Sequence, residues 1–250
     1  MLLSSQRPTH IGENEYHMGR MNLSFSEEQI GRDRDSTMNE DAKLVWVTNM
    51  LMQTDNLFGF SAESTQGDPK EYLRNIYKYQ VGDEVPPGFL PDIMWSNDAE
   101  DDRRKNLPDF FRANDFLIIS RKFADVLRQF DYGDSEIIPV RLVHSDQESP
   151  YPGDHQLLYL REAKEAFEPD YSSRFRRPRM DGQTHLGSMS GIPADGDISV
   201  NPSATDGADL WQDPRLLKSI FFSDRLIRAL LEQNLLGGVK YFRCPVVAHI

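Results

Sequence analysis

The chain has 250 residues, with 28 Lys and Arg against 40 Asp and Glu, which gives a formal net charge of −12. Nucleic acids are bound through their phosphates by a surplus of basic side chains, so this balance argues against an autonomous nucleic-acid-binding protein. The 14 Phe, 9 Tyr and 3 Trp supply enough large apolar side chains for a core, which argues against a wholly disordered chain.

The cysteine count and the first residues indicate the compartment. Cys244 is the single cysteine, which excludes an intramolecular disulfide and every zinc site that needs two thiolates. Its place before Pro245 in an apolar run is typical of a buried, unreactive thiol. Residues 1–8 lack the apolar core of a signal peptide, and no stretch approaches the roughly 18 apolar residues of a membrane span. We therefore expect a soluble, cytoplasmic protein that does not bind membranes.

The first 42 residues are polar and carry eight acids and four bases, without a helical or strand period. They predict a polar, partly flexible N-terminal segment, followed by a single α+β domain over residues 43–250. The domain begins with a predicted strand at residues 43–47, which are rich in β-branched and aromatic side chains.

A helix is predicted over residues 69–79, with Pro69 in its first turn and apolar side chains on one face. Three prolines in residues 85–91 then predict an irregular connector, because proline removes a backbone donor and fixes φ. Acidic residues run directly into basic ones over residues 98–105, which favours a solvated loop over a metal or phosphate site.

The clearest pattern covers residues 107–143. Residues 116–119 predict a buried strand, and Ser120 is the N-cap of a predicted helix over 121–131. A strand is predicted over residues 137–143, where Pro139 indicates a sheet edge or a bulge.

The C-terminal part repeats this order. An apolar run at 219–222 precedes Ser223, a helix is predicted over 223–234, and a strand is predicted over 239–247. Ser120 then aligns with Ser223, and Pro139–Val140 aligns with Pro245–Val246. Two related strand–helix–strand units explain this repetition, and so does a chance recurrence of common helix signals.

The region between the two copies is less regular. Residues 156–160 predict a strand and residues 161–167 a short helix, but a long irregular insertion follows at about 169–207. Four arginines at its start are followed by six aspartates in residues 180–215. This segment either packs against the acidic remainder of the protein through its arginines or contacts a partner.

The predicted fold class is α+β, with a mixed or antiparallel sheet packed by a few helices. We expect this one sheet to carry the strands near residues 44, 116, 138, 157 and 240. The helices over 121–131 and 223–234 should pack against it.

The sequence predicts no catalytic residue, metal ligand or cofactor. The six histidines form no metal-binding pair. The glycines of Gly187–Gly191 have the spacing of a nucleophile elbow, but the central position, which must be serine, is Met189. An enzyme with a dispersed active site around His144, His155 or His185 remains an alternative.

Five motifs carry a resemblance to a known family: Leu107–Phe111, Phe116–Leu127, Ile138–Val140, Asp209–Trp211, and Phe222–Leu226 with Gly237–Gly238. They resemble immunity family eleven of bacterial polymorphic-toxin systems, formerly a domain of unknown function, over roughly residues 72–247. The resemblance implies a cytoplasmic inhibitor that binds a cognate toxin domain and protects the producing cell and its kin. It implies no catalytic residues, and residues 1–42 and 169–207 do not match its pattern.

We therefore expect a toxin or effector domain as the partner. A net charge of −12 suits a basic partner through charge complementarity. An adaptor or chaperone that holds an effector for a secretion system is a further alternative, and the sequence indicates no oligomeric state. Trp211 either anchors the insertion to the core or forms an interface hot spot. The candidate contact residues are Arg174, Arg176, Arg177, Arg179, Asp181, Asp195, Asp197, Asp206, Asp209 and Trp211.

Overall fold

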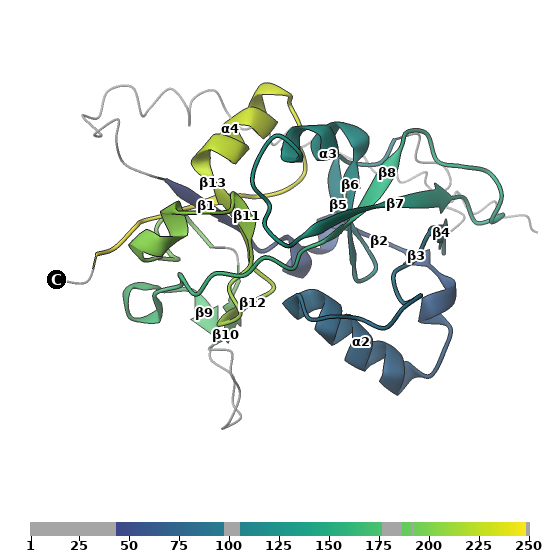
Figure 1. Cartoon of the computed structure of the whole chain (residues 1–250), viewed down its shortest axis with the longest axis horizontal. Helices are drawn as coiled ribbons and strands as arrows, with labels where there is room; N and C mark the ends of the chain where they lie inside the picture. The colour runs from purple at the N-terminus through teal and green to yellow at the C-terminus, as the bar shows by residue number, and fades with distance from the viewer. Residues whose placement is uncertain (1–43, 98–105, 177–186, 192, 249–250) are drawn as a thin grey trace, which may run out of the picture. The chain divides into compact units, whose positions relative to one another are not determined.

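A computed structural model describes residues 44–97, 106–176, 187–191 and 193–248. All of them lie within one compact part of the chain, Met38–Ile250. Across these residues the chain forms three α-helices and three β-sheets, which confirms the α+β class (Figure 1). The helices are α2 (Pro69–Val81), α3 (Arg121–Leu127) and α4 (Asp224–Glu232). No helix in the described part is long and apolar enough to cross a membrane. The predicted N-terminal segment and the loop over 98–105 lie outside the described residues.

The largest sheet has seven strands and nearly closes into a barrel. Its strands, in their order across the sheet, are β2 (Leu57–Phe58), β5 (Phe110–Ala113), β6 (Phe116–Ser120), β8 (His155–Tyr159), β7 (Glu136–Val143), β4 (Ile93–Ser96) and β3 (Phe60–Ser61). Only Gly59 separates the two edge strands, β2 and β3. One short segment therefore pairs with β5 by its first half and with β4 by its second half.

Aromatic side chains fill the barrel, because alternate residues of each strand point inward. Phe60, Phe111 and Phe116 are among the buried residues of this core. Helix α2 packs against the same core through Ile76 and Tyr79. The Tyr79 hydroxyl accepts a hydrogen bond from the Leu117 N–H (2.9 Å) and donates one to the Leu158 carbonyl (2.8 Å), so it ties α2 to two strands.

A second, four-stranded sheet has the order β11 (Leu210–Trp211), β13 (Ile220–Ser223), β1 (Val45–Thr48) and β14 (Phe242–Cys244). A third sheet has the order β12 (Leu216–Leu217), β10 (Gly187–Met189) and β9 (Phe175–Arg176). The prediction that one sheet carries all five predicted strands is therefore wrong. The strands near 44 and 240 form a different sheet from those near 116, 138 and 157, because β1 pairs with β13 and β14.

The predicted insertion supplies part of a second core. Ile198, Val200 and Met189 are buried together with Phe167 and Trp211. Short 3-10 turns at Pro169–Tyr171 and Pro202–Thr205 lie in the same region. The described residues of this segment thus include two short strands, β9 and β10, and are packed by apolar side chains, which the Gly, Ser, Pro and Asp content did not indicate. Cys244 is buried in this core, and burial raises the pKa of its thiol, as expected for an unreactive cysteine.

The two predicted strand–helix–strand units are related in three dimensions. The strand order β5–β6–β8–β7 in the barrel matches β11–β13–β1–β14 in the second sheet, and every pairing within both sets is antiparallel. The register also matches. A row across the first set contains Ser120, His155 and Val140, and the equivalent row contains Ser223, Val45 and Cys244. The predicted alignment of Val140 with Val246 is therefore wrong by two residues.

Both units carry the same helix cap. The Ser120 hydroxyl accepts a bond from the Phe123 N–H (3.2 Å) and donates to the Asp109 carboxylate (2.5 Å). In the second unit the Ser223 hydroxyl accepts from the Leu226 N–H (3.2 Å) and donates to the Asp209 carboxylate (2.5 Å). Helices α3 and α4, which follow these caps, lie side by side (Figure 1).

Three predicted elements differ from the structure by more than two residues. Residues 161–167 form no helix, because the Asp213 carboxylate binds the Ala166 N–H (2.7 Å) and the Phe167 N–H (2.6 Å) and holds the segment extended. Helix α3 ends at Leu127 rather than 131, and the predicted strand over 239–247 is reduced to β14. Pro139 lies in the half of β7 that pairs only with β8 in the structure, so the predicted edge position is confirmed.

Candidate partner-binding surfaces

Asp209 is buried and therefore cannot present a charge to a partner. Its side chain is 1% exposed and binds the guanidinium of Arg225, with an Nη2 to Oδ2 distance of 2.7 Å. It also accepts bonds from the Ser223 hydroxyl and from the Asp131 N–H (3.0 Å). Burial alone raises its pKa, but the hydrogen bonds from Arg225 and Ser223 outweigh this and hold the pKa below its ordinary value.

Trp211 is also interior, which confirms the core-anchor interpretation and corrects the hot-spot alternative. Its side chain is 0% exposed and stacks on Phe221, with ring centroids 5.7 Å apart. The Lys164 ammonium lies 3.9 Å from the Trp211 ring centroid and donates to the Ala208 carbonyl (2.5 Å). This cation–π contact ties Lys164 to the end of β11, and the full burial of Trp211 leaves no indole surface for a partner.

Of the other predicted contact residues, the structure brings four together. Residues 174–176 and 195–197, which carry Arg174, Arg176, Asp195 and Asp197, belong to neighbouring segments joined by the Ser173 N–H to Asp197 carbonyl bond (2.7 Å), and Arg174 lies close enough to Asp197 to lower its pKa. Asp206 is exposed at a different place, the turn before β11, where its carbonyl accepts a bond from Lys164 (2.6 Å). Arg177, Arg179 and Asp181 lie outside the described residues.

Tyr171 adds an aromatic ring to these four residues, and we call the five together the Tyr171 surface. Its side chain is 54% exposed, although its backbone carbonyl is held by the Ser199 hydroxyl (2.7 Å). Arg174 has a φ of 51°, a left-handed conformation uncommon for a residue other than glycine. The Ser190 N–H donates to its carbonyl (2.7 Å) and stabilises this backbone. Tyr171 is not among the predicted contact residues, because an exposed tyrosine leaves no periodic signal in the sequence.

The acids of the Tyr171 surface are held in place by local bonds. The Asp195 carboxylate accepts from the Arg243 Nε (2.9 Å) and backbone N–H (2.8 Å). The Ala194 N–H and the Ser173 hydroxyl lower the pKa of Asp197. Both carboxylates are therefore positioned on a defined backbone rather than on a loose loop.

A groove of about 260 Å³ is a second candidate surface that the sequence did not predict. It lies between the proline connector and the ends of β7 and β8, and we call it the proline groove. Its lining residues are Glu84, Val85, Pro86, Pro87, Gly88, Leu90, Glu136, Tyr159 and Arg161. The three prolines predicted the connector, but its position beside two distant strands depends on tertiary packing.

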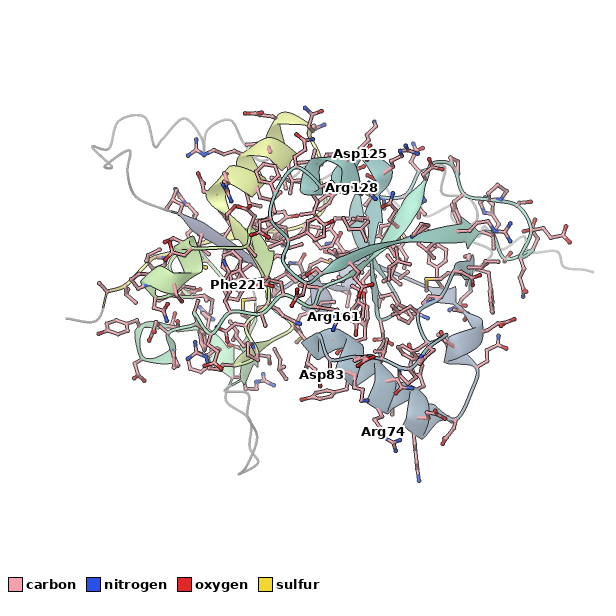
Figure 2. All side chains as sticks on the ribbon, in the orientation of Figure 1. Arg74, Asp83, Asp125, Arg128, Arg161 and Phe221 are labelled. Carbon is pink, nitrogen blue, oxygen red and sulfur yellow. The ribbon has the colours of Figure 1, made fainter. Side chains whose placement is uncertain are left out.

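The charged groups of the proline groove form a small network. Arg161 Nη1 binds Glu136 Oε1 at 3.1 Å, and its guanidinium carbon lies 5.6 Å from the Tyr159 ring centroid. The Tyr159 hydroxyl donates to the Asp83 carbonyl, so the connector is tied to the groove floor. The hydrogen bond to Glu136 is the main reason that the pKa of Arg161 is raised above its ordinary value. Figure 2 labels Arg161 and Asp83 near the C-terminal end of α2.

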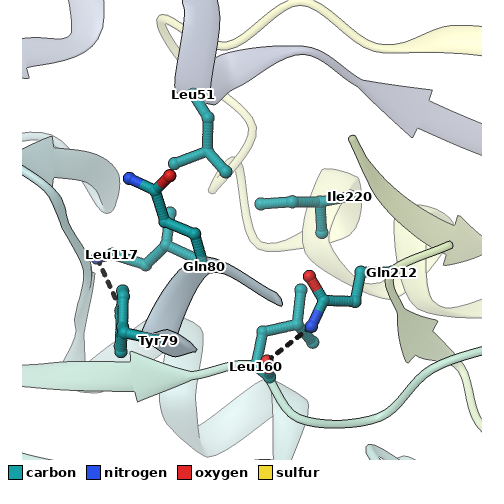
Figure 3. Close-up of a pocket in the computed structure, with 7 residues that line it drawn as sticks. All are labelled: Leu51, Tyr79, Gln80, Leu117, Leu160, Gln212 and Ile220. Atoms are coloured by element: carbon teal, nitrogen blue, oxygen red, sulfur yellow. Dashed lines mark hydrogen bonds between the residues drawn. The ribbon is translucent and has the colours of Figure 1, made fainter. Parts of the chain in front are cut away.

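A small internal cavity of about 10 Å³ lies between the barrel and the second unit (Figure 3). Tyr79, Leu117 and Leu160 line it from the barrel side, and Gln212 and Ile220 from the other side. The Gln212 amide donates to the Leu160 carbonyl (3.1 Å). A volume of this size is close to that of one water molecule, so the cavity holds no substrate.

Two of the three histidines named for a dispersed enzyme site lie in the described part of the chain, and each packs on a different aromatic ring. His155 is buried with its ring edge-to-face against Phe111, and burial lowers its pKa. His144 packs on Tyr151 with ring centroids 4.0 Å apart, and His185 lies outside the described residues. Across the described ranges, no group of three His, Cys, Asp or Glu side chains is arranged to hold a metal ion. Neither a protein-family model nor a curated protein sequence matches the chain.

Proposed function

We propose that the protein is an immunity protein, which binds a cognate bacterial toxin domain and neutralises it. The Tyr171 surface is the observation that carries this proposal. It combines an exposed tyrosine, two arginines and two aspartates on hydrogen-bonded backbone. Tyrosine and arginine are the residue types that most often dominate the binding energy of protein interfaces.

The physical setting favours binding of a protein over binding of a small molecule. The Tyr171 ring is exposed while the backbone beneath it packs on the second core, so little ordering is required when a partner binds. Mixed charges on one patch suit a partner with complementary charges rather than a uniform polyanion. The resemblance to immunity family eleven points to the same class of partner.

The test is titration of the full chain with the toxin domain encoded beside it. Tyr171→Ala should weaken the complex by about 30-fold, since an interface hot spot contributes about 2 kcal/mol. Tyr77→Ala is the matched control, because Tyr77 is 49% exposed on α2 and Tyr171 is 54% exposed. It should leave the dissociation constant unchanged.

Two results would contradict the proposal. The first is the absence of any complex at micromolar concentration, and the second is an equal loss of affinity in both tyrosine variants. Co-expression provides a separate measurement. An immunity protein rescues cells from the toxin, whereas a secretion adaptor changes export and leaves toxicity intact.

A further inference from the structure

We infer that the proline groove is a docking site for a basic segment of a partner protein, with one lysine or arginine side chain of that segment seated in it. The inference goes beyond the proposed function, because the groove shares no residue with the Tyr171 surface. It rests on the shape, the lining and the charge of the groove.

The size of the groove fits one long side chain. Pockets for drug-sized ligands and cofactors have volumes of roughly 300–1,000 Å³. The proline groove, at about 260 Å³, is smaller and open to solvent along the exposed prolines. An extended segment can therefore lie across it and insert a single side chain.

The lining matches a side chain with an apolar stem and a cationic end. Val85, Pro87 and Leu90 offer apolar contacts for the methylene groups of lysine or arginine. The Tyr159 ring is 3% exposed and the Arg161 guanidinium lies over it at 5.6 Å, so the cationic end meets the carboxylates of the groove rather than this ring.

The charge of the groove selects a cation over an anion. Two carboxylates, Glu84 and Glu136, line it against one guanidinium, Arg161, which Glu136 binds at 3.1 Å. Asp134 lies close enough to Arg161 to act on its charge, and Asp83 lies beside Tyr159. The groove region is thus acidic within a chain of net charge −12, so an incoming basic segment is attracted to it.

The experiment measures binding of a fluorescently labelled hexalysine peptide to the full chain by anisotropy. The double variant Glu84→Gln/Glu136→Gln should weaken binding about tenfold, as expected for loss of two charge contacts worth about 1.4 kcal/mol together. The control is Asp146→Asn/Glu148→Gln, at exposed positions just beyond the far end of β7. Both double variants change the net charge by the same amount, so the control should weaken binding less than about twofold.

Three results would overturn the inference: no binding of hexalysine, equal weakening by the two double variants, or equally tight binding of hexaglutamate. Equal weakening would mean that the net charge alone attracts the peptide. The outcome is independent of the toxin titration. If Tyr171→Ala loses the toxin complex but still binds hexalysine, both proposed sites are supported. If the wild-type protein binds hexalysine but forms no toxin complex, only the proposed function is contradicted.

Discussion

Asp209 joins two helix ends through one buried carboxylate. It accepts bonds from Arg225 and Ser223 at the start of α4 and from the Asp131 N–H beyond the end of α3. The equivalent Asp109 of the first unit binds the hydroxyl of Ser120, its own capping serine. Asp209 therefore has a role in the contact between the units as well as in capping.

The lowered pKa of Asp209 predicts a pH-dependent contribution to stability. Because the folded-state pKa lies below the ordinary value of about 3.9, this contribution is present above pH 4 and is lost as the pH falls through the folded-state pKa. Asp209→Asn should reduce the free energy of unfolding by about 2 kcal/mol at pH 7. Urea unfolding from pH 7 to pH 2.5 should show the difference from wild type shrinking below pH 4.

Asp125→Asn is the control for this prediction. Asp125 is exposed and pairs with Arg128 at 3.0 Å on the surface of α3 (Figure 2), so its replacement should change stability by less than about 0.5 kcal/mol. A difference between wild type and Asp209→Asn that stays constant down to pH 2.5 would contradict the assigned role of the Asp209 carboxylate.

At the scale of elements, the repeated cap predicts equal effects in the two units. Ser120→Ala and Ser223→Ala each remove an N-cap acceptor and leave an aspartate without its hydroxyl partner. Each should reduce the free energy of unfolding by about 1–2 kcal/mol. Thermal or urea unfolding of the two single variants measures this.

Serine to threonine at the same positions is the matched control, because it keeps the hydroxyl. It should restore most of the lost stability. A large effect at Ser120 with none at Ser223 would show that the two caps, despite their equal geometry, do not contribute equally.

The elements that the sequence predicted well are those with local signals. The serine caps, the apolar face of α3 and the proline connector depend on residues close in the chain, and the structure contains all three. The predicted helix over 161–167 failed because Asp213, distant in sequence, binds its backbone N–H groups. The proline groove was not predicted because its walls come from segments distant in sequence, the connector and the ends of β7 and β8.

At the scale of the molecule, the two units differ in how the chain builds them. In the first unit Arg121 and Asp154, which form an ion pair, are 33 residues apart. In the second unit Trp46 donates a hydrogen bond to Asp224, 178 residues away, because its third strand, β1, comes from the other end of the chain. Closing so long a loop is entropically unfavourable, so we expect the first unit to form earlier during folding.

Folding kinetics of two core variants test this order. Ile118→Val in β6 should slow folding, and Val47→Ala in β1 should mainly speed unfolding, because interactions absent from the transition state affect only the unfolding rate. Each should destabilise the fold by about 1–2 kcal/mol, enough for a reliable comparison. The reverse pattern, with Val47→Ala slowing folding, would contradict the order.

The segment that contains Gly59 has a consequence for how the protein avoids self-association. A sheet normally ends in two strands with unpaired backbone groups, which can recruit the same strands of other molecules. Here β2 and β3 are halves of one extended stretch, and each is paired on its inner side. Where the two ends of the seven-stranded sheet meet, it therefore offers other copies two short edges of two residues each, joined at Gly59, rather than two long edge strands, and this limits strand exchange there.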